Sequence, residues 1–326
     1  MNYKTRNELS ILIHQEQITQ NNMDEVLALS NLHPSQNDFL FFVRNTLLWV
    51  GAISLIMSLL FFMAFNWNEL GRFAKFLLVE AVMGTSILLY LFLDNYKKLQ
   101  EVLLMLASIA LGILLALIGQ TYQTGADPWQ LFAVWALLMT PWVVVAGFSG
   151  LWLLWIVLFN LGILLYFQKF DLSLFAIAEM HDNLLLLVFI LNAMLWTVWE
   201  FLASKYKAFD SAISLKFLAF LTVASISTLV ISRIYEYEHE AHQIYFVLHA
   251  LCLGAMYYVY RIRQVNVYMM SLFALSLFLL ALNLLFRVSA EYTDDFLGSI
   301  FFLLIAIGVM TTLIIAWLKH LAKEEN

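Results

Sequence analysis

A few side chains that could exchange protons or bind a polar ligand interrupt the long apolar stretches of this chain. Four fall inside such stretches and one lies at the end of one: Glu80, Asn192, His249, Asn283 and Arg287. A carboxylate and an imidazole at similar depth can share a proton, and amides can hydrogen-bond a polar ligand. Together these residues predict a polar, proton-sensitive site.

Depth within the stretches suggests which of these groups meet. At about 1.5 Å of rise per helical residue, Glu80 lies roughly 10 Å from the beginning of its apolar stretch and His249 roughly 12 Å from the beginning of its own. The orientation predicted below places both of these ends on the same face of the membrane. This favours a Glu80–His249 pair, with Arg287 as a second candidate partner for Glu80. In the alternative interpretation, Glu80 is protonated and, with the asparagines, joins helices through structural hydrogen bonds.

A second candidate site is the polar break GQTYQTGADPWQLF, residues 119–132. Asp127 and Pro128 are typical of a helix start, with Asp127 at the N-cap and Pro128 in the first turn. The preceding residues could face a polar ligand or satisfy one another and the helix ends. The residues expected to face a ligand here are Gln120, Tyr122, Gln123 and Asp127.

The run EYEHEAH contains Glu236, His239 and His242 at i, i+3 and i+6. Carboxylate and imidazole suit zinc or similar ions. This spacing is one residue short of the zinc-protease pattern, so it is a weak metal candidate, and a solvated helix end is the favoured interpretation. We predict no metal site.

The elements that must position these residues follow from composition. Hydrophobic residues make up 63% of the chain and charged residues 12%, against about 45–50% and about 25% in soluble domains. A soluble fold could not cover so much apolar surface, so we expect an integral membrane protein. Cys252 is the only cysteine, which excludes an intrachain disulfide.

Ten apolar runs approach the length of about 20 residues that a helix needs to cross a bilayer. They are continuously apolar rather than alternating, so they predict helices and not barrel strands. We therefore expect an all-α, polytopic membrane helix bundle. The predicted spans are 40–66, 73–93, 101–119, 129–147, 151–168, 183–203, 212–232, 241–260, 265–286 and 295–317.

Basic residues predict the orientation of these spans. Ten spans place both termini on one face, and only five of the 17 Lys and Arg residues fall on the other: Arg72, Lys75, Lys169, Arg233 and Arg287. Because basic residues accumulate on the cytoplasmic side, we expect both termini in the cytoplasm. We expect three parts: a short cytoplasmic helical head at residues 1–38, a transmembrane domain at residues 39–318 and a cytoplasmic tail at residues 319–326.

Three segments together resemble one family. They are WVGAISLIMSLLFFMAFNW (49–67) after the helical head, NELGRFAKF (68–76) and GILLALIGQTYQTGADPWQLFAVWALL (112–138). Over about residues 5–168 the chain is similar to the prokaryotic predicted membrane proteins called domain of unknown function 2157. The resemblance implies a multi-spanning protein of the bacterial inner membrane and supplies no catalytic residues.

The sequence carries no phosphate-binding glycine loop, cysteine cluster, nucleophile elbow or basic nucleic-acid patch. We therefore expect no cofactor and no nucleic-acid partner, and enzymatic activity is disfavoured. The expected function is transport or permeation of a small solute or ion through the proton-sensitive site. The alternative is a non-catalytic accessory or sensory subunit acting through a membrane-protein partner or a second copy of the chain. An intramembrane enzyme, ranked lowest, would need a lateral opening to the bilayer near His249.

Overall fold

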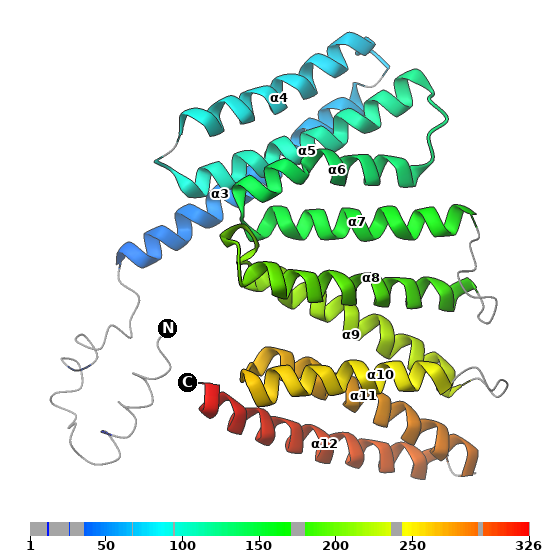
Figure 1. Cartoon of the computed structure of the whole chain (residues 1–326). Coiled ribbons are helices and arrows are strands. Elements are labelled where there is room, and N and C mark those ends of the chain that lie inside the picture. The colour runs from blue at the N-terminus through cyan, green and yellow to red at the C-terminus, as the bar shows by residue number, and fades with distance from the viewer. Residues whose placement is uncertain are drawn as a thin grey trace. The chain divides into compact units, whose positions relative to one another are not determined.

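The computed structural model describes residues 36–66, 68–93, 95–170, 180–235, 243–292 and 296–325, with the single positions 12 and 26. In these ranges every regular element is helical, and ten helices are long and apolar enough to cross a membrane (Figure 1). The predicted all-α bundle of ten spans is confirmed. Most of the predicted head lies outside the described ranges.

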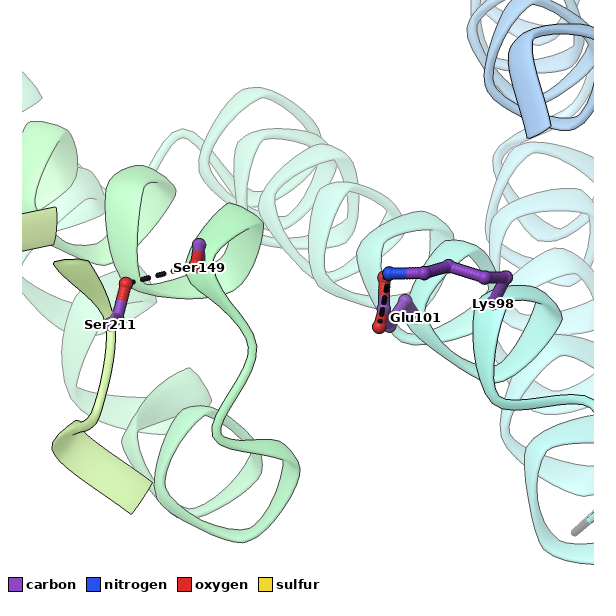
Figure 2. A network of polar contacts seen from close by, with 4 residues as sticks. All are labelled: Lys98, Glu101, Ser149 and Ser211. Atoms are coloured by element: carbon purple, nitrogen blue, oxygen red, sulfur yellow. Dashed lines mark hydrogen bonds and ion pairs between the residues drawn. The ribbon is translucent and has the colours of Figure 1, made fainter. Parts of the chain in front are cut away.

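The chain divides into two units, the first of which ends at Ala110. It contains α3 (Gln36–Phe65), α4 (Arg72–Phe92) and the beginning of α5 (Lys97–Tyr122). The Gln100 side chain donates to the carbonyl oxygen of Tyr90 across the α4–α5 turn, at 3.0 Å. Lys98 and Glu101 form an ion pair of 2.8 Å in the first turn of α5 (Figure 2). This pair is partly exposed and contributes little to stability.

The second unit, residues 111–325, begins within α5 and holds seven further long helices. Helix α10 ends in the π-helical segment η4, and the short 3-10 helix η2 precedes α9. The elements are α6 (Pro128–Ala146), α7 (Ser149–Phe170), α8 (Met180–Ala203), η2 (Lys207–Phe209), α9 (Ala212–Ile234), α10 (Gln243–Tyr257), η4 (Tyr258–Arg263), α11 (Val267–Tyr292) and α12 (Phe296–Glu325).

Helix α9 is the centre of the second unit because it packs against α7, α8, α10 and α11. Two apolar clusters include its side chains, one with α8 and α10 and the other with α10, α11 and α12. Thr222 and Ser227 of α9 are buried, and their hydroxyls donate to the carbonyl oxygens of Leu218 and Val223 one turn earlier. Small residues that satisfy their own hydroxyls let neighbouring helices approach closely.

The turn between α6 and α7 packs on the loop before α9. Gly147 ends α6 with φ 60°, a left-handed conformation that glycine adopts without strain. The indole of Trp152 donates to the carbonyl oxygen of Ala208 at 2.8 Å, and Trp199 donates to that of Phe209 at 3.0 Å. The Ser211 hydroxyl donates to that of Ser149 at 2.9 Å (Figure 2). These contacts hold the ends of α7, α8 and α9 together.

Candidate functional site

Asn192 pairs with another asparagine in the interior of the second unit. Its side chain is fully buried and donates to Oδ1 of Asn160 on α7 at 2.6 Å, and Asn160 returns a hydrogen bond of 3.1 Å. Each amide also donates to a carbonyl oxygen one turn earlier, that of Val188 or Ile156. The donors and acceptors are mutually satisfied, so the pair joins α7 to α8.

His249 has serine partners. Its Nε2 lies 2.8 Å from the Ser276 hydroxyl on α11, which lies 2.7 Å from the Ser227 hydroxyl on α9. All three side chains are buried, and His249 is only 4% exposed. This hydrogen-bonded chain connects α10, α11 and α9. His249 does not line any of the pockets described for this structure.

Asn283 and Arg287 lie near the end of α11, where they contact the end of α9. Asn283 accepts a hydrogen bond of 2.8 Å from the Tyr235 hydroxyl, and Arg287 donates to the carbonyl oxygen of Ile234. The guanidinium of the buried Arg233 lies 5.6 Å from the centre of the Tyr245 ring on α10. Arg287 thus caps the carboxyl end of α9, and the hydrogen bonds of Asn192 are with Asn160 and Val188 instead.

Glu80 lies midway along α4, with its side chain exposed. It belongs to the first unit, whereas His249 and Arg287 belong to the second. Their pairing therefore stays a prediction. The weak metal candidate Glu236, His239 and His242 falls outside the described residues. Within the described part of the chain, no group of three or more His, Cys, Asp or Glu residues could hold a metal ion.

The polar break is shorter than the sequence predicts. Gln120 and Tyr122 belong to the last turn of α5, while Gln123 and Asp127 lie in the loop. Asp127 occupies the N-cap position with Pro128 beside it, as predicted, but its carboxylate pairs with Lys169 at 3.1 Å and does not cap the helix. A cavity of about 680 Å³ lies beside the loop. Of the residues predicted to face a ligand, Gln120 and Asp127 line this cavity.

A pocket of about 400 Å³ lies between α8 and α10, with α9 at its base. The residues at its mouth, Thr197 on α8 and Leu251 and Ala255 on α10, are exposed on the side of the bundle. Its base is formed by buried groups that include Phe189 and Thr222. These helices are long and apolar enough to cross a membrane, and the pocket opens on the side of these spans. Cys252 also lines it.

One end of this lateral pocket is polar. The Tyr260 hydroxyl donates to Oε2 of Glu200 at 2.8 Å. The Trp196 ring is parallel to that of Tyr260, with ring centres 5.9 Å apart and 4° between their planes. Tyr260 lies in the π-helical segment η4, a type of helical irregularity that is frequent at functional sites. A carboxylate and two aromatic rings therefore face an otherwise apolar space.

Sequence reasoning missed Glu200 and Tyr260. A signal was present, because Phe189, Ala193, Trp196 and Glu200 recur at helical spacing and share one face of α8. Tyr260 carried no comparable signal. Its role depends on the packing of α10 beside α8, and that packing is not readable from one sequence.

These helices and contacts define a multi-pass α-helical membrane protein with a ligand-sized lateral pocket. Residues 12–152 match the family described as Predicted membrane protein (DUF2157). This part of the chain is thus a DUF2157 domain, in agreement with the resemblance of segments 49–76 and 112–138. The lateral pocket lies beyond the matched residues. No curated protein and no solved structure matches the chain.

Proposed function

We propose that this protein binds a small amphiphilic molecule in the lateral pocket, as the recognition step of its transport. The observation that carries the proposal is an apolar space between three spans that ends in a carboxylate. Its volume of about 400 Å³ falls within the range of about 300–1,000 Å³ typical of small-molecule sites.

The polar groups deeper in the second unit support this choice of site. Asn160 and Asn192 are hydrogen-bonded to each other, with Asn192 buried and Asn160 half-buried. The buried side chains of His249, Ser276 and Ser227 form a separate hydrogen-bonded chain. They act as contacts between helices and offer little to a ligand. Glu200 differs from them because it faces a pocket that opens at the surface of the bundle.

Filling the mouth of the pocket tests the proposal. Ala255→Trp should place an indole in the opening, and Val247→Trp places the same group on an exposed part of α10 that does not line the pocket. We expect native mass spectrometry of protein released from its own membranes to show a bound small molecule on wild type and V247W but not on A255W. Equal occupancy of the two variants would exclude the lateral pocket as the binding site.

A second candidate function rests on the exposure of Glu80 midway along α4. A carboxylate in contact with hydrocarbon is costly, so in the membrane this face of α4 must meet water or protein. Contact with water favours proton-coupled transport through Glu80. Contact with another protein favours the accessory-subunit alternative.

Carbodiimide labelling distinguishes these two states, because the reagent modifies protonated carboxyl groups that it can reach within a membrane. A pH-dependent modification of Glu80, absent in Glu80→Gln, is expected if Glu80 exchanges protons with water. A Glu80 that reacts only after the membrane is dissolved in detergent would instead indicate a protein-covered face.

A further inference from the structure

The charge of the lateral pocket points to the class of molecule that it binds. Among the described residues that line it, Glu200 is the only acidic or basic side chain. The Tyr260 hydroxyl occupies Oε2, and no contact described in the structure involves Oε1. A carboxylate with a free oxygen in an apolar pocket favours a cationic ligand over an anion or a neutral molecule.

The aromatic residues beside Glu200 favour the same ligand charge. Trp196 and Tyr260 present ring systems at the carboxylate end of the pocket. Aromatic faces attract ammonium groups, and tryptophan does so most strongly. The remainder of the pocket is lined by apolar groups such as Phe189, Leu248 and Met256, which suit a hydrocarbon or aromatic body.

We propose that the ligand of the lateral pocket is a small amphiphilic ammonium ion. The ammonium group pairs with Glu200 beside Trp196, and the apolar body lies between α8 and α10. This inference rests on the proposed function and adds the chemical class of the ligand. The volume of about 400 Å³ suits a free, drug-sized cation and is small for the two chains of a phospholipid.

The only cysteine of the chain provides the assay, because Cys252 lines the pocket. The protein is reconstituted in phosphatidylglycerol vesicles, and the rate of Cys252 modification by a membrane-permeant thiol reagent is followed by intact-protein mass spectrometry. The probes are 4-phenylbutyltrimethylammonium and its uncharged isostere, in which carbon replaces nitrogen. A Met194→Cys, Cys252→Ala variant, with its thiol on an exposed part of α8 outside the pocket, controls for effects on the reagent.

For each protein, we compare the concentrations of the cation and of the isostere that protect Cys252. We expect the isostere-to-cation concentration ratio to be about tenfold higher in the wild-type protein than in Glu200→Gln. The amide of E200Q can still accept from Tyr260, and protection by the isostere at its wild-type concentration shows that the variant retains its pocket. Glu200→Asp, which keeps the charge, should retain part of the preference.

Other outcomes separate the two proposals. Equal protection by both probes, unchanged in E200Q, would overturn the ammonium assignment and leave the proposed function intact. No protection by either probe would overturn the binding site itself. Protection that arises on adding phosphatidylethanolamine alone would identify a lipid headgroup as the ligand and contradict the assignment to a free cation.

Discussion

An amide in the protein interior lowers stability when its hydrogen-bond partner is removed. The Asn160–Asn192 pair allows this loss of stability to be measured. Asn192→Leu leaves Oδ1 of Asn160 without the 2.6 Å hydrogen bond that it accepts in the interior. We expect each single leucine variant to lower the free energy of unfolding by about 1–2 kcal/mol.

The double variant Asn160→Leu, Asn192→Leu should lose less stability than the sum of the two single variants, because no unsatisfied amide remains. Thermal unfolding in detergent, arranged as a double-mutant cycle, measures the coupling. Strictly additive losses would show that the two amides do not stabilise each other.

Ser276 provides a second prediction at the residue scale, because it bridges His249 and Ser227. Ser276→Ala removes the described partner of His249 Nε2 in the interior, and we expect a loss of about 1 kcal/mol. Ser271→Ala on the same helix is the control, since its hydroxyl donates only to the carbonyl oxygen of Tyr268, one turn earlier. Equal melting temperatures for the two variants would contradict a stabilising role for the His249 chain.

At the scale of elements, the contact between α5 and α6 depends on a missing side chain. A Cβ at Gly112 would lie 2.5 Å from the Trp135 ring, whereas one at Gly119 on the same helix would meet nothing within 4 Å. Gly112→Ala should destabilise the protein by about 1–3 kcal/mol, because Trp135 must move. Gly119→Ala should be neutral or stabilising, since alanine favours helix. Thermal unfolding of the two variants is the measurement, and an unaffected G112A would contradict a tight contact between Gly112 and the Trp135 ring.

Most helices were predictable from the sequence because a bilayer imposes their length and apolar composition. Helix α6 begins at Pro128 after Asp127, as the local residues predict. Helix α5 continues to Tyr122 beyond the predicted end at 119, because Gln120 and Thr121 can extend a helix where a span meets polar surroundings. The limits of a span and of its helix differ for this reason.

The candidate site was only partly predictable, because depth in a span does not say which helices touch. The depth of His249 suggests Glu80 as a partner, and that pairing stays a prediction. The structure places Ser276 beside His249, and the sequence does not distinguish this serine from the others. Glu200 lies one turn from the end of its predicted span, where a carboxylate normally reaches water. Only the packing of α10 places Tyr260 over it.

At the scale of the whole molecule, the polar groups of the second unit are of two kinds. Some are buried and join helices, while others face a pocket that opens at the surface. Helix α9 collects the buried contacts at the centre, and the lateral pocket opens between two of its neighbours, α8 and α10. If the predicted orientation holds, the Glu200 end of the pocket faces the cytoplasmic side. A ligand would then enter from the lipid with its charged group towards the cytoplasm.

We propose above that the space between α8 and α10 is a binding site. Cryo-electron microscopy of the protein in nanodiscs made with its own membrane lipids tests this most directly. We expect density in the lateral pocket, with a polar group against the Glu200 carboxylate and an apolar body extending towards Cys252. A closed interface, with α10 packed against α8 and the Trp196 and Tyr260 rings filling the space, would contradict it.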